Sequence, residues 1–103
     1  KGSGKAIPIS EKKMYQLGDH FNKHGKAMGY ESKKAYDAAA REFANINQEN
    51  SNAQIFEGIW NGTVQRAISY EGKTVILDKA TGQIIDFYEG CEFRGWINIT
   101  QIQ

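Results

Sequence analysis

The sequence predicts an α+β domain in which two N-terminal helices pack on a four- to five-stranded antiparallel sheet. The hydrophobic residues follow a helical period up to about residue 50 and the alternating period of strands after it. The second half also contains Asn61-Gly62, which is the strongest short signal for a hairpin turn. A chain of 103 residues, of which 40% are hydrophobic, is long enough for one such domain with a modest core.

The first helix is expected over residues 11–25. Ser10 is a favourable N-cap residue, and Gly25 is placed to end the helix in a left-handed conformation. A short linker, residues 27–31, follows. The buried stripe of this helix shows the three- and four-residue spacing of one helical face and consists of Met14, Leu17 and Phe21.

The second helix is expected over residues 33–46, with Ser32 as its N-cap. Its alanines permit close approach to a neighbouring element. The stretch 45–52 is rich in Asn, Gln and Ser, which indicates that a loop follows the helix. The expected buried stripe consists of Tyr36, Ala39, Ala40, Phe43 and Ile46.

Five short strands joined by tight turns are expected after residue 52. The turn signals are Asn61-Gly62, Glu71-Gly72 and Thr81-Gly82, and Glu89-Gly90 bends the chain toward the last strand. Tight turns make consecutive strands antiparallel neighbours, so the sheet is a meander. The expected strands are 54–60, 63–70, 73–78, 83–88 and 93–102.

The alternation of side chains gives this sheet an apolar face and a polar face. The apolar face is expected to be buried and consists of Val64, Ile68, Tyr70, Val75, Leu77, Ile85, Phe87, Phe93, Ile97 and Ile99. The polar face consists of Thr63, Gln65, Ser69, Thr74, Asp86, Tyr88, Arg94, Trp96, Asn98 and Thr100. Aromatic side chains beside polar groups can stack nucleic-acid bases, although the same pattern also describes an ordinary solvated face.

Arg66 breaks this alternation, because its position in the strand places it on the apolar face. Three interpretations are open: the residue lies near an edge, lies on a bulge, or is an inward charge with a partner. A cation in such a place is also a candidate for binding phosphate.

Composition excludes several classes of protein. The longest apolar runs are only a few residues, so neither a transmembrane helix, a signal peptide nor stable membrane insertion is expected. The single cysteine, Cys91, excludes an internal disulfide framework and a multi-cysteine zinc site; it is either a turn residue or a thiolate with nothing obvious to activate it. Walker, GxGxxG and GxSxG motifs are absent, which argues against nucleotide-driven enzymes and serine hydrolases.

Charge and composition also vary along the chain. Residues 1–9 contain Gly, Ser, Lys and the only proline, as in a linker or a cut end, so the expected domain is 10–103. Residues 1–45 hold nine Lys or Arg against five Asp or Glu, a charge of +4, whereas residues 46–103 hold four against seven, a charge of −3. The basic half favours phosphates, or is simply the solvated surface of two helices.

The only two histidines, His20 and His24, are four residues apart and lie on one flank of the stripe of the first helix, together with Lys13. Because histidine titrates near neutrality, such a pair can divide general acid and base work. The pair can also be an ordinary surface feature or a helix cap. A metal site is a weaker alternative, because the segment lacks the glutamate of HExxH and Lys23 opposes a cation.

The segment from Asp19 to Tyr30 (DHFNKHGKAMGY), followed by Ser32–Asp37 and Ala40–Phe43, resembles a known pattern. It is similar to the helices of C-terminal nuclease domains of contact-dependent growth inhibition (CdiA) and other polymorphic toxins of bacteria. These domains share the fold of barnase, EndoU, colicin D and RelE, in which N-terminal helices pack on an antiparallel sheet. The resemblance covers roughly residues 13–103.

The resemblance implies a ribonuclease that needs no cofactor or metal and cleaves RNA, most often tRNA. The ribose 2′-OH attacks the adjacent phosphate and leaves a 2′,3′-cyclic phosphate. Carried over to this chain, it assigns proton transfer to His20 and His24 and phosphate contacts to Thr100, Arg66 and Tyr88. Lys13, Lys23 and Trp96 complete the expected substrate-binding set.

The resemblance further implies export on a larger effector, delivery to the cytoplasm of a target bacterium, and a cognate immunity protein. In some relatives elongation factor Tu presents the tRNA, and the near-neutral charge of this chain makes such a helper relevant. Two alternatives stay open: a non-enzymatic module that binds nucleic acid or protein, and a DNase or metal-dependent nuclease. Chelator-resistant cleavage of RNA separates them from the ribonuclease.

Overall fold

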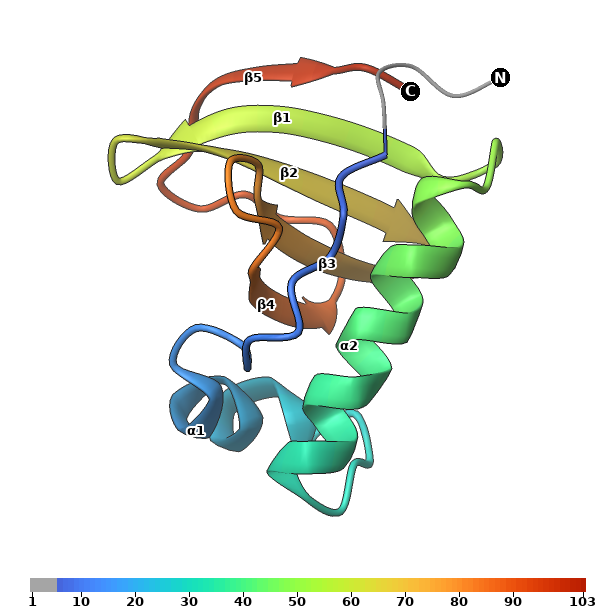
Figure 1. Ribbon diagram of the computed structural model, residues 1–103, viewed down its shortest axis with the longest axis vertical. Helices are drawn as coiled ribbons and strands as arrows, with labels where there is room; N and C mark the ends of the chain where they lie inside the picture. Colours follow the sequence, from blue (N-terminus) through green and yellow to red (C-terminus); the bar gives the residue numbers. More distant parts are fainter. Residues whose placement is uncertain (1–5) are drawn as a thin grey trace.

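The computed structural model describes residues 6–103, which form the predicted α+β fold (Figure 1). Two short helical segments, one long helix and five strands follow one another along the chain. They are α1 (Leu17–His20), the π-helical turn η1 (Phe21–Gly25), α2 (Lys33–Gln48), β1 (Gln54–Trp60), β2 (Thr63–Tyr70), β3 (Lys73–Asp78), β4 (Ile84–Glu89) and β5 (Ile97–Gln101).

The five strands form one antiparallel sheet in the order β4-β3-β2-β1-β5. Asn61 and Gly62 both have positive φ, at 53° and 81°, which is the primed turn that matches the twist of a hairpin. Glu71 and Gly72 repeat this arrangement between β2 and β3. The expected turns are confirmed, but the predicted meander is wrong for the last strand, which pairs with β1 rather than with β4.

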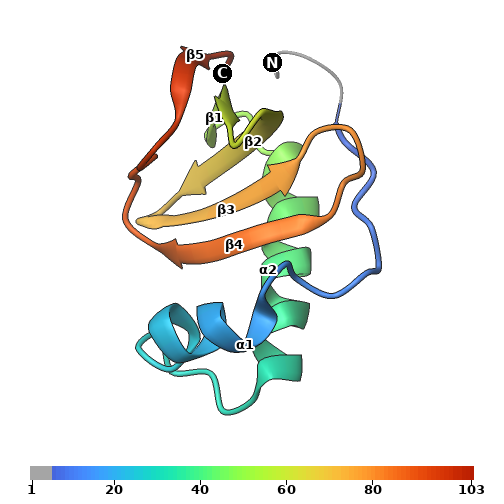
Figure 2. The ribbon, with the colours of Figure 1, turned by 90° about the vertical axis from the view of Figure 1, so that its left-hand side faces the viewer.

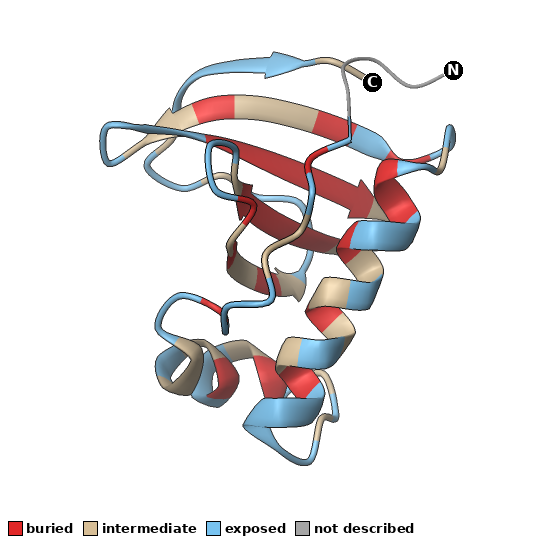
Figure 3. Cartoon of the chain, viewed as in Figure 1, coloured by how far each residue is buried: buried red, intermediate tan, exposed pale blue. Residues whose placement is uncertain are grey.

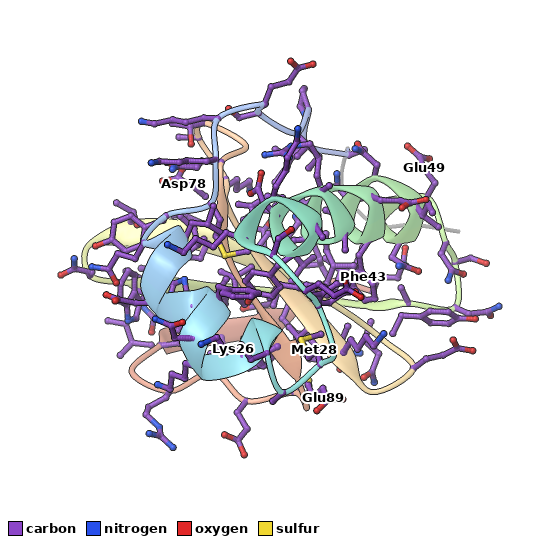
Figure 4. All side chains as sticks on the ribbon, turned by 90° about the horizontal axis from the view of Figure 1, so that it is seen from below. Lys26, Met28, Phe43, Glu49, Asp78 and Glu89 are labelled. Atoms are coloured by element: carbon purple, nitrogen blue, oxygen red, sulfur yellow. The ribbon has the colours of Figure 1, made fainter. Side chains whose placement is uncertain are left out.

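The core lies between α2 and one face of the sheet (Figure 2), and the buried residues concentrate along these facing surfaces (Figure 3). Ser32 caps α2, since its hydroxyl accepts from the N–H of Ala35 at 3.0 Å, as predicted. Phe43 points from α2 toward the sheet (Figure 4), with its ring centroid 5.1 Å from that of Phe87. The core centres on Tyr36, Ala40, Ala44, Ile55, Ile68, Val75, Leu77, Ile84 and Phe87.

The first helix is shorter than predicted, because it begins at Leu17 rather than at residue 11. The N–H of Ser10 donates to the carbonyl of Gly82 at 2.9 Å, and that of Tyr15 donates to the carbonyl of Ile84 at 2.9 Å. The N–H of Met14 donates to Asp37 at 2.9 Å. The N–H groups of Ser10, Met14 and Tyr15 thus have distant partners, and this segment is not helical, so Ser10 caps no helix and Met14 is buried outside one.

Gly25 has a different role from the one predicted, since it lies buried within η1 and is not left-handed. A Cβ at this position would come within 2.6 Å of the ring of Phe21 and 3.0 Å of that of Tyr36, so only glycine fits. The left-handed residue that follows is Gly29, with φ 93°.

The prediction of the apolar sheet face is partly wrong. Val64, Ile97 and Ile99 are exposed, as is Ile46 on α2, because α2 covers only part of the sheet. A bulge between β3 and β4 pairs Leu77 with Ile84, so Ile84 enters the core in place of Ile85. Phe93 lies before β5 rather than in it.

The expected linker 1–9 lies partly outside the described residues, and its described part packs on the domain. Ile7 is buried, its N–H donates to Gln48 at 2.8 Å, and its carbonyl accepts from the same side chain at 2.8 Å. None of the helices in the described chain is long and apolar enough to cross a membrane.

Candidate active site

A cleft of about 520 Å³ opens on the sheet face opposite α2, between the α1–η1 segment and the chain that joins β4 to β5. Side chains of β2 and β4 that alternate with the core residues form its floor. The lining residues are Tyr15, Gln16, His20, Lys23, His24, Trp60, Gln65, Ile76, Ile85, Asp86, Tyr88, Glu92, Phe93, Arg94, Gly95 and Trp96.

His20 and His24 line the helical wall of this cleft, with their ring centroids 6.3 Å apart. Asp86 on β4 faces both rings: its Oδ1 lies 3.7 Å from Nδ1 of His20, and its Oδ2 lies 3.8 Å from Nε2 of His24. These distances are those of charge pairs rather than hydrogen bonds. The N–H of Phe87 donates to Oδ1 at 2.8 Å and orients the carboxylate.

The two histidines differ in their surroundings. Burial lowers the pKa of His24 below 6.5; the carboxylate of Asp86 raises it, and Lys23 and His20 lower it again. His24 is therefore mostly neutral at pH 7. In His20, Nδ1 is buried without a hydrogen-bond partner among the described residues, so Nε2 is the nitrogen left for a ligand.

Tyr88 lies beside His24, with ring centroids 5.5 Å apart. The hydroxyl of Tyr88 donates to the backbone carbonyl of Glu92. Burial raises the pKa of Tyr88 above that of free tyrosine. A hydroxyl engaged in this way serves to hold the β4–β5 connection against the cleft.

The opposite wall of the cleft is aromatic. The rings of Phe93 and Trp96 stack with centroids 5.1 Å apart, and Trp60 lines the same cleft. Gly58 on β1 makes room for Trp96, because a Cβ there would come within 2.5 Å of the indole. The cleft thus has imidazoles on one side and a broad aromatic surface on the other.

The structure brings some of the expected site residues together and leaves others apart. His20, His24, Lys23, Tyr88 and Trp96 all line the cleft. The other three expected residues, Lys13, Thr100 and Arg66, are not among its lining residues.

Lys13 precedes the helix, so its predicted place on the helical flank is wrong, and Thr100 lies on β5 opposite Glu57.

Arg66 is the inward charge with a partner: its Nε and Nη2 donate to Oε2 of Glu57 at 3.0 and 2.7 Å. Burial alone would raise the pKa of Glu57, but hydrogen bonds from Lys79 and Arg66 lower it overall. The guanidinium is therefore committed to a structural ion pair.

Asp86, Gln65 and Trp60 were not predicted as site residues. Asp86 and Gln65 lie on the predicted polar face of the sheet, and Asp86 is two residues from Tyr88. That spacing was the available signal, but it does not show that β4 lies beside the histidines. No signal in the strand pattern indicated Trp60.

Among residues 6–103, no group of three or more His, Cys, Asp or Glu side chains is arranged to hold a metal ion. Cys91 is not among the residues that line the cleft, and the hydroxyl of Ser69 donates to its sulfur at 3.3 Å. Comparison of the chain with protein-family models, with curated proteins and with solved structures finds no match, so the chemistry of the cleft rests on its own residues.

Proposed function

We propose that the chain is an endoribonuclease that cleaves RNA by transesterification through the ribose 2′-OH. The observation that carries the proposal is the pair of imidazoles that faces one carboxylate in an open cleft. Two such groups supply the base and the acid that the reaction requires.

His24 is the better base, because its lowered pKa keeps it neutral at pH 7. It takes the proton of the 2′-OH as the 2′-oxygen attacks phosphorus. His20 is the acid: its Nδ1 lies 3.7 Å from Oδ1 of Asp86, and its Nε2 gives a proton to the departing 5′-oxygen. The 2′-O–P bond forms, the P–O5′ bond breaks, and the products are a 2′,3′-cyclic phosphate and a 5′-hydroxyl.

The cleft also carries the charges that a phosphate backbone needs. Lys23 and Arg94 line it and offer cations to the phosphates, while the aromatic wall offers stacking surfaces. Asp86 and Glu92 lower the net positive potential of the cleft. This charge balance supports a requirement for a helper protein, such as elongation factor Tu presenting tRNA.

The experiment measures RNA cleavage, product ends and thermal melting for His20→Ala, His24→Ala and the exposed control Lys34→Ala. Loss of one proton-transfer group is expected to slow cleavage by ~10²–10⁴-fold, whereas loss of one partly exposed charge pair with Asp86 costs only ~0–1 kcal/mol of stability. Cleavage should persist in EDTA. Wild-type rates in both histidine variants would refute the assignment, and absence of any cleavage by the wild type would favour a non-enzymatic module.

We extend the proposal to the biological setting implied by the resemblance of residues 19–43. The chain then acts as the toxin domain of a larger exported effector, cleaves tRNA in the cytoplasm of a target bacterium, and is held inactive by an immunity protein. The excess positive charge of residues 1–45 suits an acidic inhibitor seated over His20, His24 and Lys23.

Association with that inhibitor should be fast and should slow steeply as salt is added. Lys23→Glu should reduce the association rate, whereas Lys34→Glu, at an exposed position that does not line the cleft, serves as the charge-matched comparison. An inhibitor complex in which RNA still reaches both histidines would overturn occlusion as its mode of action.

A further inference from the structure

The part of the cleft away from the histidines is unusual for its combination of aromatic rings and one buried amide. Trp60, Phe93 and Trp96 line it, and Gln65 lies on its floor. Both tryptophans of the chain are in this one place. Proton transfer from the 2′-OH and to the departing 5′-oxygen requires none of these groups, so they need a separate explanation.

The orientation of the Gln65 amide follows from its neighbours. The hydroxyl of Thr63 donates to the carbonyl of Trp60 at 3.1 Å, which uses its only proton. It can therefore only accept from Gln65, whose Nε2 lies 2.8 Å away. This places Oε1 on the other side of the amide, where it has no hydrogen-bond partner among the described residues.

An unpartnered acceptor is costly in a side chain that is only 2% exposed, and such groups call for an explanation in function. Oε1 itself has almost no exposed surface, so a ligand reaches it by displacing a neighbouring side chain. Phe93 and Trp96 lie on the chain between β4 and β5, which has no helix or strand of its own, and we infer that they are the side chains that a ligand displaces.

We propose that Trp60, Phe93, Trp96 and Gln65 form a subsite for one unpaired nucleobase of the RNA. The indole and phenyl rings stack on the base, and Oε1 of Gln65 accepts a hydrogen bond from an N–H on the base's Watson–Crick edge. Every common base has an amino or imide N–H on that edge, but in a duplex this group is already paired and the ring faces are already stacked. The subsite therefore selects single-stranded segments and loops, and the inference rests on the proposed function.

The test uses intrinsic tryptophan fluorescence with 2′-O-methyl RNA, which cannot be cleaved because its 2′-oxygen is blocked. A mixed-sequence single strand should quench the fluorescence, and the same strand annealed to its complement should bind at least about tenfold more weakly at equal salt. Trp96→Ala should weaken single-strand binding roughly 5- to 150-fold, and Trp96→Phe less, because it keeps a stacking face. Gln65→Met should weaken it roughly 2- to 10-fold.

Ile46→Ala, which shortens an exposed side chain on α2, is the control and should bind as the wild type does. Trp60→Ala provides a second aromatic deletion if Trp96→Ala does not fold. Equal affinity for single strand and duplex, or unchanged affinity in the folded tryptophan variants, would overturn the subsite. Binding that depends on Trp96 without cleavage of unmodified RNA would overturn the ribonuclease instead, so the two failures are distinguishable.

Discussion

Replacement of Asp86 by Asn tests whether one carboxylate supports both histidines. The change removes a charge 3.7 and 3.8 Å from two imidazole nitrogens but keeps an oxygen that can accept from the N–H of Phe87. At such a separation, a pair of charges interacts by about 1 kcal/mol in water and about 4 kcal/mol at the effective dielectric of a protein surface. We therefore expect kcat to fall roughly 5- to 1,000-fold while the fold is retained.

The same variant changes the pH dependence in a definite direction. Asp86 raises the pKa of His24, so Asp86→Asn should lower that pKa further, and the acid limb of the rate profile should move to lower pH. Because the chain has two histidines, NMR titration of their ring protons resolves each one. Asp78→Asn is the control, since Asp78 accepts backbone N–H groups in the turn after β3. A kcat within twofold of wild type, with an unchanged titration of His24, would refute the reasoning.

Three further outcomes are expected. The pKa of His24 is lower in the folded state, so the unfolded chain binds the proton more readily, and stability should fall as the pH drops through 6.5. In His24→Gln this pH-dependent loss of stability should be absent when melting is compared at pH 7.5 and pH 5.5. Gly25→Ala should cost about 1–3 kcal/mol in urea unfolding, because its Cβ would collide with Phe21 and Tyr36. Thr100→Val should leave kcat within twofold of wild type, because Thr100 lies outside the cleft; a tenfold loss would return it to the site.

Local signals were sufficient for much of the fold. The Asn-Gly and Glu-Gly turns and the Ser32 cap depend on neighbouring residues, so they predicted β1, β2, β3 and the start of α2 to the residue. The start of the first helix depends instead on hydrogen bonds from residues 10–15 to Gly82, Ile84 and Asp37, which no local pattern reveals. The bulge that brings Ile84 into the core is likewise a property of the β3–β4 pairing.

In the candidate site, too, local features were predictable and features that depend on tertiary contacts were not. The spacing of His20 and His24 on a helical flank was readable, because helical geometry survives the shortening of the helix. The contribution of Asp86 could not be predicted from the sequence, since that prediction requires knowing that β4 borders η1. Thr100 and Arg66 were expected beside phosphate, but the return of β5 to the far edge and the ion pair with Glu57 place them elsewhere.

The irregular segment before α1 also determines when the site can form during folding. The α1 and η1 segments together span nine residues, too few for a helix that is stable alone in water. They are held by contacts that join very distant parts of the chain, such as the bond from Gln83 to the carbonyl of Lys13 across 70 positions. Because closing so large a loop costs conformational entropy, we expect α1 and η1, which carry the two histidines, to dock only after the β3–β4 hairpin has formed. Partly folded chains should therefore lack the imidazole pair, and we expect ordering of the two histidine rings to be among the last steps of refolding.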